Sequence, residues 1–337
     1  MQADTHTVIE PAANAATDDA PVLEAAFLKA LCLEAGAGDA GFVELERPAL
    51  DFEREDILQV FPGARTVAAL VFPLNPENMR SRVRNMSSSE FHNASEEAAE
   101  VSRKLLRRLN RLGVRGVAVP ADFPMDMSRY PGKIWHVSHK IMAVQAGLGH
   151  MGINRLVIHP EFGNFVRLTS LLLDARLDAY GSPLEENPCI RCGLCTAVCP
   201  VGAISRDKPF DLMTCMTHAY RDNSVGFTDM LGALVASKDM AAFGERFNER
   251  EIASMWQSLM YKMNYRCGYC MSVCPAGKAG GMGYLGSEKQ FVREVFTPLR
   301  DRKEEVYVAQ GSPAEARARK NPNKNVRVVG YTRERKQ

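Results

Sequence analysis

Four cysteines stand within the stretch CIRCGLCTAVCPVGAI, which runs from Cys189 to Ile204. They are separated by two, two and three residues, and a proline follows the last of them. Two-residue gaps let one tight loop bring several thiolates around a single centre, and the proline turns the chain because it cannot continue a helix. This density of thiols predicts a metal or redox centre rather than a framework of disulfides.

A second group of cysteines repeats this pattern with one thiol missing. It consists of Cys267, Cys270 and Cys274 in CGYCMSVCPAG, and Cys215 stands alone in DLMTCMTHAY. Eight of the nine cysteines therefore belong to one third of the chain. The ninth, Cys32 in KALCLEAG, lies in an apolar, helical setting and is expected to be a buried small residue.

The spacing C-x2-C-x2-C-x3-C-P is that with which bacterial ferredoxins hold 4Fe–4S clusters, and in two-cluster proteins its fourth cysteine binds the other cluster. We therefore expect eight thiols to hold two clusters by crossed ligation. One cluster is assigned Cys189, Cys192, Cys195 and Cys274, and the other is assigned Cys199, Cys215, Cys267 and Cys270. Zinc would accept the C-x2-C pairs, but it explains neither the triple spacing nor the two C-P endings.

The composition is that of an ordinary globular chain of one or two domains. Among 337 residues, 46% are hydrophobic and 24% are charged, and the net charge is +2. So small a net charge gives no global reason to expect nucleic acid as a partner. No segment has the uninterrupted apolar length of a membrane span, and the N-terminus carries no export signal. These features predict a cytoplasmic protein.

The chain in front of the cysteines predicts an α/β domain over residues 21–180, after a flexible N-terminus of residues 1–20. Apolar β-branched runs predict buried strands over 64–74 and 114–121, and a capped amphipathic pattern predicts a helix over 95–113. The runs NRLVIHP and NFVRLTSLLLDA are expected to form a hairpin that closes this domain. The order of strands and helices suggests a layered domain with a largely buried sheet.

Residues 181–290 are expected to form a ferredoxin-like domain around the cysteines, with a helical insertion over 216–266. The Phe, Met and Trp residues of the insertion favour either a lid over an acceptor or an ordinary helical core. Residues 291–337 are expected to form a helix and a basic tail. From residue 311 onward there are eight Lys or Arg against two Glu. That balance predicts a solvated tail, or alternatively a docking arm for RNA or an acidic partner.

The segment AGLGHMGINRLVIHPEFGNFVRLTSLLLDA, followed by the two cysteine groups, resembles the epoxyqueuosine reductase and reductive dehalogenase superfamily. In that family a nitroreductase-like domain binds a corrinoid, and a ferredoxin-like domain delivers electrons to its cobalt. The resemblance implies cobalamin as a cofactor, with FMN as an alternative because nitroreductase-like folds often hold a flavin. Glycines would let the backbone approach such a ligand, although a plain turn also needs them. The implied binding residues are Gly147, Gly149, His150, Gly152 and Arg167.

The chain also departs from the family pattern just before AGLG. Epoxyqueuosine reductases are similar to one another in a segment D-S/T-x-P-V/I-x-E, where this chain has RYPGKIWHVSHKIMAVQ. Reductive dehalogenases pair a tyrosine with a lysine or arginine to protonate the product, and residue types here allow the same pairing. Histidines that titrate near neutral pH are further candidates, although packing or surface exposure would also explain them. The candidate proton donors are Tyr130, Lys133, His136 and His139.

Together these features predict an iron–sulfur reductase that passes electrons to a bound cobalamin. The expected substrate is a small organic molecule or a modified nucleoside, with tRNA as the partner that epoxyqueuosine reductases imply. The expected electron donor is a ferredoxin, a flavodoxin or a reductase. The alternative is a non-catalytic or flavin-linked electron-transfer protein whose α/β domain docks a partner. His218, three residues after Cys215, is expected to tune a cluster by a hydrogen bond to sulfur.

Overall fold

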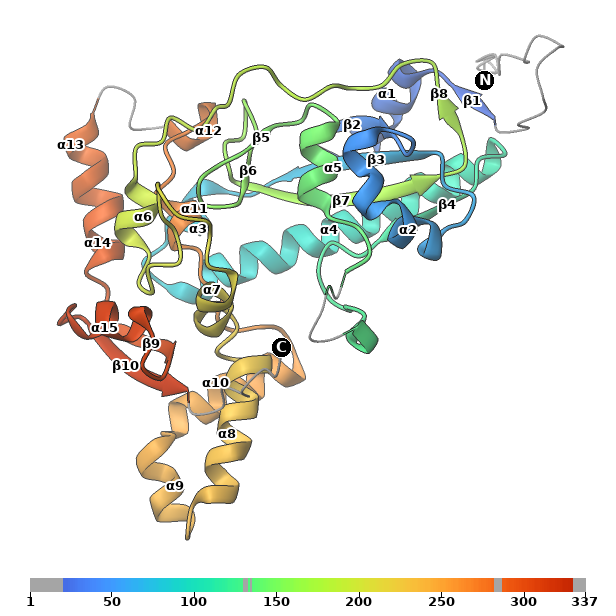
Figure 1. Ribbon diagram of the computed structural model, residues 1–337. Coiled ribbons are helices and arrows are strands. Elements are labelled where there is room, and N and C mark those ends of the chain that lie inside the picture. The colour runs from blue at the N-terminus through green and yellow to red at the C-terminus, as the bar shows by residue number, and fades with distance from the viewer. Residues whose placement is uncertain (1–20, 130–132, 134, 282–286, 330–337) are drawn as a thin grey trace, which may run out of the picture.

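The computed structural model describes residues 21–129, 133, 135–281 and 287–329. Its first part has three layers, in which helices cover both faces of a four-stranded sheet (Figure 1). The strand order is β2–β3–β7–β4, and every neighbouring pair is antiparallel. The four strands are β2 (Asp39–Glu44), β3 (Thr66–Pro73), β4 (Gly116–Val119) and β7 (Val166–Leu173).

The central strands are buried on both faces because their sequences are continuously apolar. Strand β3 reads TVAALVFP, and each of its residues except the last is buried. Successive side chains of a strand point to opposite faces, so Leu70 and Phe72 enter one core while Val67 and Val71 enter the other. This double burial fixes the register of the sheet, since a slip of one residue would exchange the two faces.

One face of the sheet is covered by α1 (Ala25–Ala35) and α4 (Arg84–Arg111). Leu31 of α1 and Leu105 of α4 lie in this core. Cys32 is fully buried beside them, as its apolar setting predicts. None of the helices formed by the described residues is long and apolar enough to span a bilayer.

The opposite face is covered by α2 (Asp51–Val60) and α5 (His139–Gln145), through buried side chains that include Ile57 and Met142. Short elements connect these layers. They are β1 (Val22–Leu23), η1 (Pro48–Leu50), α3 (Pro76–Arg80), η2 (Met127–Arg129), β5 (His150–Met151), β6 (Val157–Ile158) and β8 (Arg176–Leu177).

The mixed class expected from the sequence is confirmed, with both predicted strands in place and the predicted helix 95–113 extended back to Arg84. The predicted hairpin is wrong. Strand β6 pairs with β5, while β7 lies between β3 and β4. The apolar run of β7 is buried best at the centre of the sheet, so only an isolated bridge from His159 to Gly163 joins the two predicted runs.

The cysteine-bearing part contains short helices joined by loops (Figure 1). These helices are α6 (Leu194–Val198), α7 (Leu212–Ala219), α11 (Tyr269–Ser272) and α12 (Lys278–Gly281). Between α7 and α11 three helices project from the rest of the molecule (Figure 1), namely α8 (Ser224–Ala236), α9 (Met240–Arg246) and α10 (Glu249–Met260). They share a small core of their own, which includes Phe243, Phe247 and Met255.

The C-terminal part begins with a helix built from α13 (Glu288–Phe291), a π-helical turn (Val292–Phe296) and α14 (Thr297–Arg300). Strand β9 (Glu304–Ala309), helix α15 (Pro313–Arg319) and strand β10 (Lys324–Val329) follow. The two strands pair in parallel.

The expectation of a solvated tail from residue 311 is therefore wrong for residues 313–329. Val326 and Val328 alternate with charged or polar residues, which is the period of a strand, and they pack beside Val306 and Val308 against the cysteine segment. The net positive charge concealed this short pattern. Residues 330–337 lie outside the described residues.

We expect slow amide exchange in β9 and β10, because paired and buried strand amides exchange only when the structure opens. Val308 is 1% exposed. The variant Val308→Asp should abolish this protection, since it buries an unpaired charge, whereas Asn325→Asp at an exposed strand position should preserve it. Hydrogen exchange read by mass spectrometry measures both. Unprotected exchange in the unmodified chain would contradict the folded C-terminal unit.

Candidate functional site

The first group of thiols surrounds a small cavity at the start of α6. Cys189, Cys192, Cys195 and Cys274 all line it, together with Ile153 and other apolar residues. Gly193 begins the helix in a left-handed conformation with φ of 82°, which lets the loop turn sharply between two cysteines. Burial, together with the other three thiols of the group, raises the pKa of Cys274 to about 12.

The second group lies where the end of α6, helix α7 and the start of α11 meet. Burial raises the pKa of Cys270 well above its usual range, and Cys267, Cys215 and Cys199 add to this effect. Burial likewise raises the pKa of Cys215 to about 12, and Cys267 and Cys199 act in the same direction. The thiols that influence Cys274 and Cys270 thus include the three that crossed ligation assigns to each of them. Cys195 also raises the pKa of Cys270, so the two groups adjoin each other.

The donor chemistry fits iron–sulfur clusters. Both groups offer sulfur alone, all nine cysteines are free, and apolar side chains exclude water. Among the described residues, no three His, Cys, Asp or Glu side chains gather as the ligands of one metal ion. The thiolates of a cubane each bind a different iron, so they stand farther apart than ligands of a single ion.

A cluster of charged and polar side chains borders the second thiol group, and we call it the cationic cluster. Arg167 near the start of β7 and Asp122 beyond the end of β4 meet because these strands are antiparallel neighbours. The distance from Arg167 Nη2 to Asp122 Oδ2 is 3.0 Å, and Arg266 also pairs with this carboxylate. The other members are Lys140 and Tyr220.

Two nitrogens of the cationic cluster have no partner. Arg167 Nε and Arg266 Nε are buried without a hydrogen bond among the described residues. Arg266 precedes Cys267 directly in the sequence. Buried donors in native proteins are nearly always satisfied, so this pair of guanidinium groups fits a ligand oxygen.

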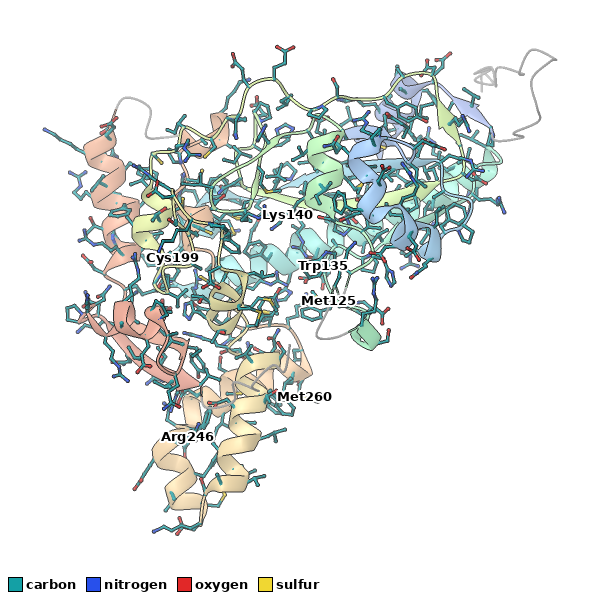
Figure 2. The ribbon with its side chains drawn as sticks, in the orientation of Figure 1. Met125, Trp135, Lys140, Cys199, Arg246 and Met260 are labelled. Carbon is teal, nitrogen blue, oxygen red and sulfur yellow. The ribbon has the colours of Figure 1, made fainter. Side chains whose placement is uncertain are left out.

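Lys140 and Tyr220 connect the cationic cluster to the thiols. Lys140 lies on α5, near the cysteine-bearing loops (Figure 2), and donates a hydrogen bond of 2.8 Å to the carbonyl of Arg155. Burial lowers the pKa of Lys140, while the nearby thiols of Cys270 and Cys215 act in the opposite direction. Burial raises the pKa of Tyr220, while Arg266 acts to lower it. The phenol is therefore protonated at neutral pH.

The structure gives two of the predicted proton donors acidic partners. Lys133 Nζ lies 2.7 Å from Asp56 Oδ2 on α2, and His136 Nε2 lies 3.1 Å from Asp126 Oδ2. Tyr130 lies outside the described residues. Catalysis by these residues stays a prediction.

His139 is the fourth predicted proton donor, and both of its ring nitrogens are engaged. Nδ1 lies 2.9 Å from Ser170 Oγ, and Nε2 lies 2.9 Å from the carbonyl oxygen of Pro120. Burial lowers the pKa of His139 to about 4. The imidazole is therefore neutral at pH 7 and holds its proton towards a carbonyl, a role that stabilises the start of α5.

The predicted glycine cradle is filled by the protein itself. A Cβ on Gly147 would stand 2.5 Å from the carbonyl oxygen of Ser182, and one on Gly149 would stand 2.6 Å from that of Ile158. A Cβ on Gly152 would stand 2.8 Å from Asn154 Oδ1. These glycines are required by close packing within the chain, so the plain-turn alternative accounts for them.

Of the other two predicted cofactor residues, one belongs to the cationic cluster. His150 is half-buried in β5, and its Nδ1 lies 3.4 Å from the carbonyl oxygen of Met151. Arg167 donates a hydrogen bond of 2.6 Å to the carbonyl of Ala121 and pairs with Asp122. Arg167 is the predicted cofactor-binding residue whose buried Nε has no hydrogen-bond partner among the described residues.

Neither ring nitrogen of His218 bonds to a sulfur in the part of the chain that the structure describes, which corrects the expectation from its position. Its Nε2 lies 2.8 Å from the hydroxyl of Tyr265, and its Nδ1 faces the backbone amide of Tyr307 at 3.4 Å. Burial lowers the pKa of His218 to about 3. The histidine turns towards β9 because the hydroxyl of Tyr265 and the backbone amide of Tyr307 engage both of its ring nitrogens.

Four members of the cationic cluster were missed by sequence reasoning. Asp122 carried no signal, and Lys140 lies on a helix whose neighbouring histidines drew the prediction. Tyr220 and Arg266 each lie within five residues of a ligand cysteine, which is the one signal that pointed to them.

Comparison with known proteins supports iron–sulfur binding. A family described as a 4Fe-4S binding domain matches residues 184–205. The chain is 25% identical over 279 residues to an epoxyqueuosine reductase of Bacillus cereus, covering 77% of this chain and 64% of that one. It is 24% identical over 205 residues to that of Cyclobacterium marinum, covering 54% and 63%. The predicted resemblance to epoxyqueuosine reductases is confirmed, and the chain spans less than two thirds of the length of these relatives.

Solved structures of an epoxyqueuosine reductase and of a reductive dehalogenase are similar to this chain with low sequence identities and low TM-scores. An epoxyqueuosine reductase with an epoxyqueuosine-modified tRNA stem loop has a TM-score of 0.46 at 17% identity, over 74% of this chain and 64% of that one. A catabolic reductive dehalogenase has a TM-score of 0.46 at 17% identity, over 59% and 29%.

We expect paired cysteine variants to reveal the crossing of the ligands. The unmodified protein should hold about eight irons, and Cys199→Ala and Cys270→Ala should each lose one cluster. The double variant of these two should retain about four irons, because both residues serve the same cluster. Combining Cys199→Ala with Cys195→Ala should remove both clusters. Iron and sulfide analysis measures these contents, and Cys32→Ala is the control.

Uncrossed ligation gives the opposite result. If Cys199 bound the same cluster as Cys195, its combination with Cys270→Ala would lose all iron, and its combination with a cysteine of the first run would lose half.

Proposed function

We propose that this relative of the epoxyqueuosine reductases is a reductase whose two 4Fe–4S clusters feed single electrons to an acceptor beside the cationic cluster. The observation that carries the proposal is the proximity of the second thiol group to that cluster, in which Arg266 directly precedes Cys267. Cys270 and Cys215 influence Lys140, and Cys215 influences Tyr220. Thiols that bind a redox centre thus adjoin side chains that hold protons and positive charge, which is what a reduction at carbon or nitrogen needs.

Cobalamin is the acceptor that the family resemblance implies, and it would supply one-electron and two-electron chemistry at cobalt. The unpartnered nitrogens of Arg167 and Arg266 fit amide or phosphate oxygens such as those at the edge of a corrinoid. The glycines give no separate support, since protein atoms fill the space beside them. FMN, whose phosphate would suit the same arginines, is the alternative cofactor.

The side chains of the cationic cluster have distinct tasks in this proposal. Arg167 and Arg266 bind and orient an acceptor through their free donors, and Asp122 holds the two guanidinium groups together. Lys140 places a positive charge beside the reduced cluster. Tyr220 keeps a proton at neutral pH next to these cations, so its hydroxyl is the proton donor that we assign to the substrate.

A small organic molecule or a modified nucleoside suits this site. The relatives named epoxyqueuosine reductase, and the solved one with a tRNA stem loop, favour a nucleoside. The projecting helical insertion is electrically balanced, with six Lys or Arg against six Asp or Glu over residues 216–266. Binding of tRNA phosphates needs an excess of positive charge, so the insertion is a poor surface for it.

Anaerobic reconstitution tests the proposal directly. We expect about eight irons per chain, a change in the visible spectrum when cobalamin is added, and reduction of the bound cobalamin by the clusters. Turnover should then be compared between an epoxyqueuosine-containing stem loop and a halogenated phenol. Bound clusters without binding of cobalamin or flavin would leave an electron-transfer protein and would refute the reductase.

We expect Tyr220→Phe to lower the turnover number by about a hundredfold, because the variant removes one proton donor while keeping the ring. Iron content and cobalamin binding should not change. Tyr261→Phe is the matched control, since Tyr261 is 72% exposed on the insertion. Steady-state kinetics with each variant measures the effect, and an unchanged turnover number would exclude Tyr220 as the donor.

A further inference from the structure

The loop that carries the first thiol group reaches the surface. Cys192 is exposed, and Ile190, between two cysteines of the run, is 68% exposed. An apolar side chain at such a position gains from being covered by a partner. A centre bound by Cys189 and Cys192 would lie directly beneath this loop, which makes the loop a place where electrons can enter.

Positive side chains surround the loop. Arg191 donates a hydrogen bond of 3.2 Å to the carbonyl of Arg206, and the guanidinium of Arg206 fills the space beside Gly193 that a Cβ would need. Arg317 of α15 donates a hydrogen bond of 3.1 Å to the carbonyl of Thr196. Arg206 and Arg317 are thereby held against the backbone of the cysteine run, and Arg191 belongs to the run itself.

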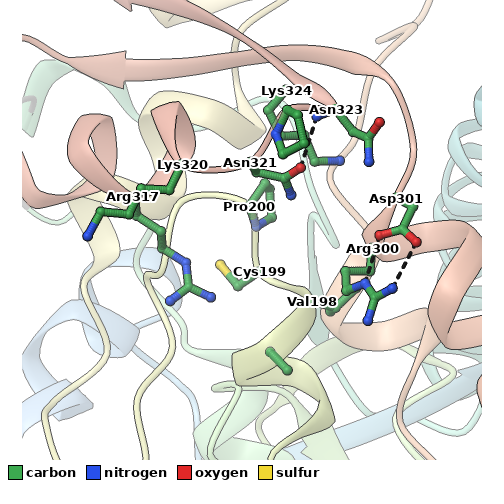
Figure 3. A pocket seen from close by; sticks show the side chains of 12 residues that line it. Val198, Cys199, Pro200, Arg300, Asp301, Arg317, Lys320, Asn321, Asn323 and Lys324 are labelled. Atoms are coloured by element: carbon green, nitrogen blue, oxygen red, sulfur yellow. Dashed lines mark hydrogen bonds and ion pairs between the residues drawn. The ribbon is translucent and has the colours of Figure 1, made fainter.

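The positive charge continues into a cleft of about 410 Å³ at the end of the run. Figure 3 shows Cys199 between Arg317 and Lys320 on one side and Arg300 on the other. Asp301, the one carboxylate that lines this cleft among the described residues, pairs with Arg300 at 2.7 Å. The net charge of the side chains that line the cleft is therefore positive. Outside the cleft, Asp207 follows Arg206 directly in the sequence.

We propose that this surface, which we call the entry face, docks a small acidic protein that carries single electrons. The entry face consists of Ile190, Arg191, Cys192, Arg206, Arg317 and Lys320. Opposite charges would steer the carrier to the cysteine loop, and Ile190 would give an apolar contact at the centre of the interface. The inference rests on the proposed function only in requiring clusters at the thiols.

An acidic protein fits this surface better than RNA does. RNA is recognised by phosphate contacts and by stacking of its bases on aromatic or guanidinium planes, and the entry face has an aliphatic side chain and a thiol at its centre. An electron carrier gains from contact with a cluster ligand, whereas RNA does not. The exposed Cys192 at the centre of the entry face therefore favours an electron-carrying protein over RNA as the partner.

The test follows cluster reduction in the reconstituted full chain and needs neither substrate nor cobalamin. Reduced flavodoxin, an acidic carrier, is mixed with the protein, and bleaching of the cluster absorbance is followed by stopped flow. We expect Arg191→Glu combined with Lys320→Glu to lower the second-order rate constant at least about tenfold and to flatten its decline with salt. Reduction by dithionite should be unchanged.

The matched control is Arg103→Glu combined with Arg107→Glu on the exposed side of α4, away from the cysteine loop. It changes the net charge equally and should leave the flavodoxin rate constant within about twofold of the unmodified value. Equal rate constants for both double variants, or a loss of RNA stem-loop binding without a loss of electron transfer, would overturn the docking assignment. Absence of iron from the unmodified protein would instead refute the proposed function.

Discussion

Eight thiols packed together, seven of them buried or half-buried and only Cys192 exposed, are the constraint on which the rest of this structure depends. Burial raises the pKa of Cys215 and Cys274 to about 12, and a neutral thiol is a poor metal ligand. Iron must therefore supply the positive charge that the surroundings withhold. The elements that exclude water from these thiols come from both ends of the second half of the chain. Metal binding and folding are consequently one process there.

A buried carboxylate joins the C-terminal strands to the second thiol group. Glu304 at the start of β9 accepts hydrogen bonds from Tyr265 and Tyr269, the tyrosines on either side of Cys267. Its charge is balanced by Lys324, whose Nζ lies 3.6 Å away, and a buried charge without such a partner would be strongly destabilising. The position of a ligand cysteine thus depends on a strand that the sequence pattern concealed.

The sequence predicted features that lie within one short segment, and it could not predict sites built from residues that are far apart in the chain. The spacing of the cysteines is a property of single loops, so the sequence predicted the 4Fe–4S binding that the family match over residues 184–205 supports. The cationic cluster was not predicted, because Asp122 meets Arg167 only through the antiparallel pairing of β4 with β7, and Arg266, which pairs with the same carboxylate, lies 144 residues from Asp122 in the sequence. The glycines of AGLGHMG suggested an open approach to a ligand, and close packing against Ser182 and Ile158 explains them instead.

The order in which the chain is synthesised gives β10 a particular place in the maturation of the protein. Proteins emerge from the ribosome with the N-terminal part first, so all eight cysteines leave the exit tunnel before Lys324 to Val329 do. Until that last strand pairs with β9, the side of Cys199 that the C-terminal unit covers is open to an iron–sulfur donor. Closure by β10 then shields the loaded centre from oxygen and from chelators, and it follows the synthesis of all eight cysteines.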